Sequence, residues 1–315
     1  MSMQHGPAPH RPALPNVIIA GVTKAGTTSL FGYLAQHPDV GVADVKEVDH
    51  YAPLVVGEPP PTLAEYAAHF RASGDHPVLL EASPRYFIGG PTLVRRLVED
   101  LSRNGRRPKV LISLREPVER MWSSYRYKRS KDRLPPGVDF AEFVRRCRRV
   151  YDAGLVRHRD HATYRTLATG VYADYLGDWF DELGDGVRVL FFDDLCDAAD
   201  ELRAVCGWLG LDPGPVDAFD LTSRNRTYQP RSQRMRRLAH RVNATMARVV
   251  ADDSSVKRAL RSTYHRLNAG TLDEPSSAAV RAELAAFYAP TLPPLREMLR
   301  QHGRTRLPSW LDVPG

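Results

Sequence analysis

Short apolar runs alternate along this chain with longer segments in which apolar residues recur every three or four positions. The apolar runs predict buried strands at 16–21, 78–82, 109–114 and 187–192, with a shorter strand at 40–43. The helical periodicity predicts helices near 26–37, 62–71, 91–103, 117–131, 139–150, 171–183 and 197–209. Alternation of strands and helices predicts an α/β fold with three layers, in which helices flank both faces of a central parallel sheet.

The alternation ends after Leu211, and no further strand is expected beyond it. The segment 231–300 is predicted to form three helical segments, broken at Asp252–Asp253 and at Gly270. Because the chain has no internal repeat and no long linker, we expect a single domain over 16–312 with a helical C-terminal extension. The segment 1–15 is polar, rich in Pro and His and without an apolar signal core, so it is expected to be a disordered arm.

Composition narrows the function classes. The 315 residues are 43% hydrophobic, enough for a large core, and the net charge of +7 favours anionic ligands. Basic clusters occur without interleaved aromatic residues or a nucleic-acid-binding motif, so no nucleic acid is expected as a partner. The sequence contains no stretch of eighteen apolar residues, so no transmembrane helix is expected. Three widely spaced cysteines, Cys147, Cys196 and Cys206, favour reduced thiols in a cytoplasmic protein, and the preference for Arg and Ala is compatible with a bacterial source.

The segment 21–30, GVTKAGTTSL, lies between the first predicted strand and the first predicted helix. In this P-loop-like arrangement, backbone N–H groups and a helix N-terminus can bind a phosphate. A Walker A loop places its lysine directly after the second glycine, whereas Thr27 stands there in this chain and Lys24 lies inside the loop. The loop is therefore expected to bind an anion with Lys24 beside the reacting atoms, unlike an ordinary ATP site.

A second motif follows the predicted strand 109–114. Arg115 ends that strand, Pro117 is placed to open a helix, and Ser123 lies about two turns into it. Arg115 and Ser123 are thus expected at the carboxyl edge of the sheet, where open α/β sheets bind their ligands.

Together, the two motifs resemble those of sulfotransferases that use 3′-phosphoadenosine 5′-phosphosulfate (PAPS). The segment 21–30 is similar to the 5′-phosphosulfate loop of that family, and 115–125 is similar to its 3′-phosphate motif. The resemblance implies sulfuryl transfer from PAPS to a hydroxyl or amine, without a metal and with release of 3′-phosphoadenosine 5′-phosphate (PAP). It implies cofactor contacts from Lys24, Ala25, Gly26, Thr27, Thr28, Ser29, Arg115 and Ser123.

A candidate base lies in the segment 43–51. This segment resembles the Lys-Glu-x-x-aromatic-aromatic segment of sulfotransferases similar to heparan sulfate 3-O- and N-sulfotransferases, in which the glutamate matching Glu47 is the catalytic base. His50 stands where an aromatic residue is usual, and Asp49 stands where histidine is frequent. Phenol and steroid sulfotransferases use a histidine base, so His50 is the rival. In a third interpretation, Glu47 is a surface acid paired with Lys46.

Two further segments resemble the family. Residues 81–87 are similar to its Glu-Lys-x-Pro-x-Tyr-Phe segment, but Ala82 stands where the glycan enzymes have a lysine that contacts the reacting centre. This departure weakens the case for a heparan-like acceptor, although Arg85 could partly substitute. Residues 223–228 resemble a Ser-Lys-Gly-Arg-x-Tyr loop that closes over the cofactor's 3′-phosphate end. That similarity implies cofactor contacts from Arg224, Asn225, Arg226 and Tyr228.

The alternative function is a P-loop nucleotide-dependent kinase. The strand 187–192, followed by Asp193, is similar to a Walker B strand whose aspartate would hold Mg²⁺. The displaced Lys24 and the motif at 115–123 favour the sulfotransferase, and Lys24 with Glu47 argues against a protein that only binds PAPS. The sequence does not distinguish among natural-product alcohols or phenols, lipids and carbohydrates as the acceptor.

Overall fold

The computed structural model describes residues 13–73, 75–105, 107–195, 198–222, 229–230, 269–270 and 278–311. In these ranges, a five-stranded parallel sheet has the order β2-β3-β1-β4-β5. Its strands are β1 (Val17–Gly21), β2 (Val40–Val42), β3 (Val78–Ala82), β4 (Lys109–Leu114) and β5 (Val187–Phe191). From β1 the chain proceeds to one side of the sheet, and from β4 it proceeds to the other. The carboxyl ends of β1 and β4 therefore form the topological switch point, the usual ligand site of such sheets.

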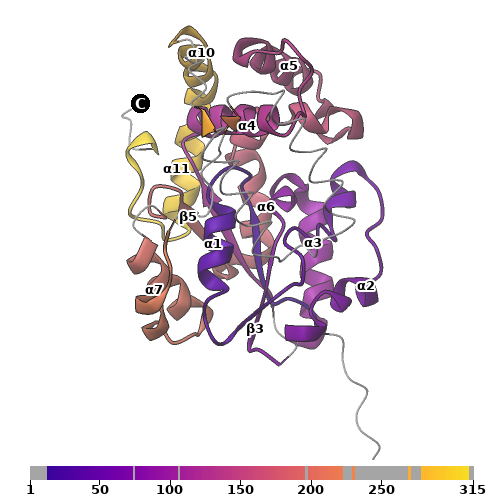
Figure 1. Ribbon diagram of the computed structural model, residues 1–315, viewed down its shortest axis with the longest axis vertical. Helices are drawn as coiled ribbons and strands as arrows, with labels where there is room; N and C mark the ends of the chain where they lie inside the picture. The colour runs from indigo at the N-terminus through magenta and orange to yellow at the C-terminus, as the bar shows by residue number, and fades with distance from the viewer. Residues whose placement is uncertain are drawn as a thin grey trace, which may run out of the picture.

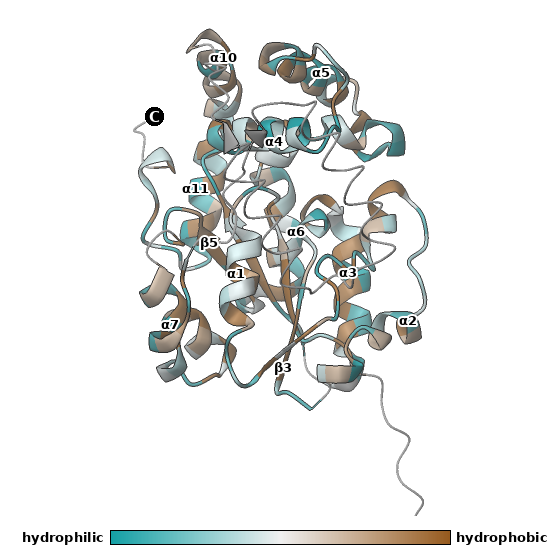
Figure 2. Cartoon of the chain, viewed as in Figure 1, coloured by the Kyte–Doolittle hydropathy of each residue, from teal (hydrophilic) through white to brown (hydrophobic). Residues whose placement is uncertain are grey.

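Helices cover both faces of the sheet (Figure 1). One face packs against α1 (Thr27–Leu34) and α7 (Ala198–Leu209). The other packs against α3 (Gly90–Leu101), α6 (Ala173–Leu183) and α11 (Leu292–Gln301). Within β1, Val17 and Ile19 face the first layer while Ile18 and Ala20 face the second, so the whole strand is buried. This double burial explains why the central strands are continuously hydrophobic (Figure 2).

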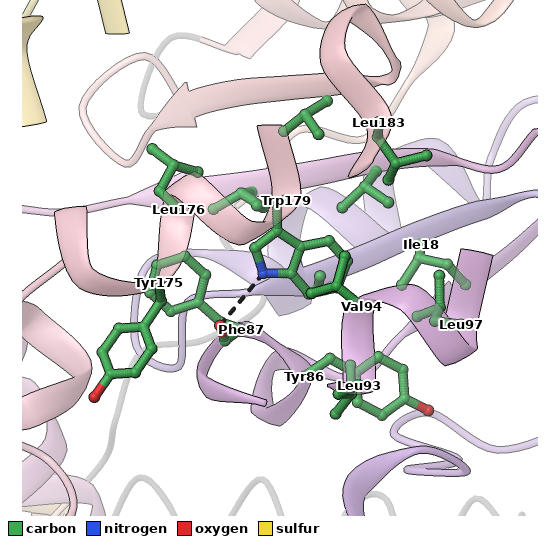
Figure 3. Close-up of a cluster of buried hydrophobic side chains, with 14 of the residues drawn as sticks. Ile18, Tyr86, Phe87, Leu93, Val94, Leu97, Tyr175, Leu176, Trp179 and Leu183 are labelled. Atoms are coloured by element: carbon green, nitrogen blue, oxygen red, sulfur yellow. Dashed lines mark hydrogen bonds between the residues drawn. The ribbon is translucent and has the colours of Figure 1, made fainter. Parts of the chain in front are cut away.

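The segment after β3 is hydrogen-bonded to a buried tryptophan of α6. Residues Pro84–Ile88 form a short 3₁₀ helix, η3, and the Trp179 indole N–H donates to the Phe87 carbonyl at 3.3 Å. Side chains of α3 and α6 surround this contact (Figure 3). The carboxyl end of β3 is thereby attached to the hydrophobic core.

A third hydrophobic cluster joins α4 (Pro117–Ser130), α5 (Phe140–Asp152) and α10 (Ala278–Tyr288). These helices gather at one end of the molecule in Figure 1. Because α4 follows β4 after only two residues, this group lies at the carboxyl end of the sheet. Two shorter elements complete the surroundings of the site: α2 (Leu63–Ala68), which a Thr62–Glu65 capping box begins, and the 3₁₀ helix η1 (Ala52–Val56).

The predicted strands and helices up to α7 are confirmed, with differences of a few residues at their ends. The prediction that strands stop after Leu211 is wrong, because β6 (Gln229–Pro230) and β7 (Ala269–Gly270) pair as a short antiparallel ladder. Gly270 lies in that ladder. A two-residue strand has no alternation to detect, so the hydrophobic pattern could not reveal it. The prediction of three helical segments falls mostly on 231–268, outside the described residues; α10 and α11 lie in its described part.

The division into an arm at 1–15 and one domain at 16–312 stays a prediction. Leu14 is 7% exposed and packs with the core. Cys147 and Cys206 are buried, free thiols, and Cys196 lies outside the described residues. None of the helices in the described ranges combines the length and apolar character needed to cross a bilayer.

Candidate functional site

The loop between β1 and α1 ends at the N-terminus of a helix. Gly26 precedes the eight-residue helix α1 with φ of 83°, and no side chain among the described residues caps the helix there. A Cβ at Gly26 would lie 3.0 Å from Leu195 Cδ1 and 3.1 Å from Phe192 Cδ2, so both the space and the backbone angle favour glycine. The first N–H groups of α1, at residues 27–29, have no carbonyl partner within the helix. Such a terminus attracts an anion.

Strand β4 holds this loop in place. The Ser113 hydroxyl donates to the Ala25 carbonyl at 2.6 Å, and the Val22 N–H donates to the Ser113 carbonyl at 2.9 Å. One residue of β4 thus fixes both sides of the loop. The loop and the end of β4 form a single unit at the switch point of the sheet.

Lys24 is half-buried inside the loop, with φ of 70°. Its ammonium lies 4.3 Å from the centroid of the Tyr127 ring, which faces it from α4. Burial and the nearby Arg115 guanidinium lower the pKa of Lys24 to about 8, while the Glu47 carboxylate opposes that shift. Lys24 and Arg115 are both half-buried, and their positive charges repel each other. An anion bound between them would stabilise the charged form of the Lys24 amine.

Arg115 lies directly against the loop. Its guanidinium donates to the Lys24 carbonyl at 3.4 Å and lies 4.2 Å from the centroid of the Phe192 ring. The Tyr172 hydroxyl donates to the Arg115 carbonyl at 2.6 Å, which fixes the backbone where β4 ends. Burial lowers the pKa of the guanidinium from its usual value, yet Arg stays protonated in proteins. Arg115 therefore adds a second positive charge to the site.

Ser123 belongs to the same surface. It is half-buried on α4, four residues before Tyr127. Residues four apart lie on one side of a helix, and Tyr127 contacts Lys24, so Ser123 lies on the side of α4 that faces the loop. The structure thus brings Lys24 and Arg115 together, and the helical spacing places Ser123 on the same side of α4 as Tyr127.

Glu47 lies on a turn that follows β2, beside the loop. Its own φ of 62° and the φ of 56° at Asp49 make this turn unusual for residues other than glycine. The side chain of Glu47 is 50% exposed, and the Lys46 ammonium donates to it at 2.6 Å. This is the surface pair of Glu47 and Lys46 that the third interpretation expects. Glu47 is also close enough to Lys24 to raise the pKa of the Lys24 amine. The Glu47 carboxylate is thus near the Lys24 ammonium.

His50 occupies a different environment, although it is only three residues away. It is 3% exposed, its ring stacks on Tyr66 at a centroid distance of 4.2 Å, and Tyr51 meets it edge-on at 4.5 Å. Burial lowers the pKa of His50 to about 4, with Asp100 of α3 acting in the opposite direction. The structure therefore places His50 in an aromatic core with α2 and α3. Its assignment as the rival base stays a prediction.

Arg85 lies three residues after Ala82, the position at which the glycan enzymes have a lysine. Ala82 is 1% exposed and packs in the core. Arg85 is exposed and forms a bidentate ion pair with Asp49, in which the Arg85 Nε lies 3.2 Å from the Asp49 Oδ1. The charge of Glu47 also acts on Arg85. Arg85 thus lies beside the turn that presents Glu47, paired with a carboxylate instead of free for a ligand.

Other predicted contacts lie outside the described residues: Arg224, Asn225, Arg226 and Tyr228. Sequence reasoning missed three aromatic residues that shape the site, namely Tyr127, Phe192 and Tyr172. Only Tyr127 left a usable signal, since it stands one helical turn beyond Ser123 in a helix that the pattern predicts. The other two contact Arg115 from elements distant in sequence.

Part of the chain is similar in sequence to known sulfotransferases. No family model matches the chain. The chain is 28% identical over 201 residues to mouse heparan sulfate glucosamine 3-O-sulfotransferase 3A1, covering 63% of this chain and 46% of the relative. The human 3A1 enzyme gives 28% identity over 202 residues, covering 63% of this chain and 45% of the relative. The membrane-associated sulfotransferase kil1 of Dictyostelium discoideum is 32% identical over 116 residues, covering 36% of this chain and 23% of the relative.

A solved structure extends the similarity to almost the whole chain. A sulfotransferase from Alicyclobacillus acidocaldarius superposes with a TM-score of 0.66, covering 95% of this chain and 99% of that one at 22% identity. The two proteins share a fold. The chain spans less than half the length of the heparan sulfate relatives that it matches.

Proposed function

We propose that this chain belongs to the sulfotransferase family and transfers a sulfuryl group from PAPS to a hydroxyl or amine, with release of PAP. One observation supports this proposal above the others. At the carboxyl edge of the sheet, Lys24, Arg115 and Glu47 lie together, at the ends of three different strands. Two cations beside unpaired helix amides suit a polyanionic donor, and a carboxylate next to them suits a base.

The residues present fit PAPS. The amides of residues 27–29 and the Lys24 ammonium would hold the 5′-phosphosulfate, which combines two anionic groups. Arg115 and Ser123 would hold the 3′-phosphate, because a guanidinium and a hydroxyl can both donate to phosphate oxygens. Both cations are half-buried, so each would gain from a bound anion.

The same residues would supply the chemistry. Glu47 would take the proton from the acceptor hydroxyl while the acceptor oxygen attacks sulfur, and the S–O bond to the departing phosphate breaks. Lys24 and the α1 amides would stabilise the negative charge that accumulates on the phosphate oxygen. Positioning and electrostatics account for most catalysis in the analogous phosphoryl transfers, so few other groups are required.

Binding of the 3′-phosphate by Arg115 and Ser123 is tested by comparing the affinities of two nucleotides. PAP should bind this protein about 10- to 100-fold more tightly than 5′-AMP, because a charge-assisted hydrogen bond contributes roughly 1.5–3 kcal/mol. Arg115→Ala should remove most of that preference. Isothermal titration calorimetry with PAP and 5′-AMP measures both affinities for each variant.

Arg95→Ala is the matched control, since Arg95 is an exposed arginine of α3 that pairs with Glu182. It should leave the preference for PAP intact. Equal affinity of the wild-type protein for PAP and 5′-AMP would contradict the assignment of Arg115 and Ser123.

The kinase alternative makes the opposite prediction. A P-loop kinase should bind ATP with Mg²⁺ more tightly than PAP, with Asp193 as a metal ligand. The same calorimetry, repeated with ATP in the presence and absence of Mg²⁺, separates the two functions. Asp193 is exposed, and its neighbour Asp194 pairs with Arg304 at 3.4 Å.

The acceptor class needs a direct search. The names of the heparan sulfate relatives make a glucosamine-containing oligosaccharide one compound to test, although Ala82 removes the lysine of the glycan enzymes. A panel should therefore also contain aliphatic alcohols, phenols, amines and lipids. Incubation with PAPS and mass detection of the added sulfuryl group would identify the acceptor.

A further inference from the structure

A buried carboxyl group lies one residue before the end of β3, and β3 pairs with β2, the strand that precedes the turn of Glu47. Glu81 is 0% exposed. Within the described residues its hydrogen-bond donors are three hydroxyls: Tyr66 at 2.7 Å, Tyr86 at 3.3 Å and Ser83 at a shorter distance. None of these three donors is a cation. Burial raises the pKa of Glu81 to about 7, with Asp49 acting in the same direction and the three hydroxyls against it.

Two of these hydroxyls connect Glu81 to the turn. The Asp49 N–H donates to the Ser83 hydroxyl at 2.9 Å, and the Tyr51 N–H donates to the Tyr86 hydroxyl at 3.2 Å. A hydroxyl has one hydrogen, so when it donates to Glu81 its oxygen remains free to accept from the backbone. Because Glu81 accepts from both hydroxyls, their oxygens face the backbone N–H groups of Asp49 and Tyr51.

The turn needs such support. Glu47 and Asp49 both have positive φ, a conformation that is unfavourable for residues other than glycine. The Glu47 side chain is half-exposed, with an ion pair to its sequence neighbour Lys46. Its position beside Lys24 therefore depends on the backbone of the turn.

We propose that Glu81 is a positioning residue, which holds the turn 47–51 through the hydroxyls of Ser83 and Tyr86 and so keeps Glu47 beside Lys24. The role of Glu47 in this inference rests on the proposed function; the support of the turn does not. Glu81 acts through other residues and takes no part in the transfer itself.

Hydrogen exchange tests the support directly. Ser83→Ala removes the acceptor for the Asp49 amide, and Glu81→Met removes the carboxylate oxygen that accepts from both Ser83 and Tyr86. Both variants should exchange at least tenfold faster in a peptide that covers 47–51, while the melting temperature shows that they remain folded. Tyr86→Phe provides a second route to the same result, because it removes the acceptor for the Tyr51 amide.

Ser124→Ala is the matched control. Ser124 is also a buried serine, but its hydroxyl is hydrogen-bonded to the Thr166 hydroxyl at 3.3 Å. It should leave exchange in 47–51 at the wild-type rate. If Ser83→Ala and the Glu81 variant exchange in 47–51 at the wild-type rate, the proposal is overturned.

Turnover tests the connection to Glu47. With PAPS and the fastest acceptor of the panel, Ser83→Ala should lower kcat by about tenfold, with KM for PAPS and PAP affinity within about twofold of wild type. On a Glu47→Gln background, Ser83→Ala should cause almost no further loss, because it acts only through Glu47.

Losses that multiply in the double variant would overturn this connection, since a general structural role gives independent effects. If Glu47→Gln alone leaves turnover unchanged, the base assignment in the proposed function fails instead. The exchange measurement still decides whether Glu81 supports the turn.

Discussion

Lys24→Ala is expected to lower turnover at saturating PAPS by about 10²–10³, the usual loss when one donor to a developing oxyanion is removed. Lys24 is the cation inside the loop, with its ammonium held over the Tyr127 ring. The neutral alanine cannot stabilise charge on the departing phosphate oxygen, while the loop amides and Arg115 remain to bind the nucleotide. Single-turnover measurements with PAPS and the best acceptor determine the loss.

Lys131→Ala is a suitable control, because Lys131 is an exposed lysine just after α4. It should retain wild-type turnover. If Lys24→Ala also turns over at close to the wild-type rate with saturating PAPS, Lys24 does not stabilise the leaving group.

The pH dependence offers an independent test of Lys24. Its pKa is lowered to about 8, so the free protein loses the Lys24 charge as the pH rises through that value. Because kcat/KM reports the ionisations of free enzyme, kcat/KM for PAPS should fall above about pH 8. Lys24→Arg should shift or abolish this decline, since a guanidinium stays protonated. A wild-type profile that is flat from neutral pH into the alkaline range would argue against a role for the charged amine.

Glu47→Gln is expected to lower turnover by about 10²–10⁴ and to leave PAP affinity close to wild type. Glutamine preserves the shape and hydrogen-bonding capacity of the side chain but cannot take the acceptor proton. The test requires an aliphatic alcohol acceptor if the enzyme uses one, because a phenol loses its proton more easily and would reduce the effect. Turnover by mass detection and PAP affinity by calorimetry are measured on the same preparations.

His50→Gln distinguishes the two candidate bases. It should affect turnover much less than Glu47→Gln, since His50 stacks on Tyr66 in a buried cluster. We expect its main effect on the melting temperature, because an amide replaces a packed ring. A larger loss of turnover from His50→Gln than from Glu47→Gln would show that the site works as in the phenol sulfotransferases.

Local sequence patterns determined the framework of this protein. Continuous apolar runs predict the five strands of the sheet, because both faces of a parallel sheet are covered and all strand positions except Val42, Lys109 and Arg188 are buried. The loop at 21–30 and the motif at 115–123 each follow such a strand directly. Their residues could therefore be placed at the carboxyl edge of the sheet before any coordinates were known, and Lys24 and Arg115 do meet there.

Only the tertiary structure decided how the residues between these motifs are used. Glu47 and His50 lie on one short segment, and sequence alone could not say which faces the loop; the turn directs His50 into an aromatic core and leaves Glu47 near Lys24. The chains of hydrogen bonds from Glu81 to this turn join residues more than thirty positions apart. Backbone periodicity is a local property, whereas the direction of a side chain and the partner of a buried polar group depend on which distant elements pack together.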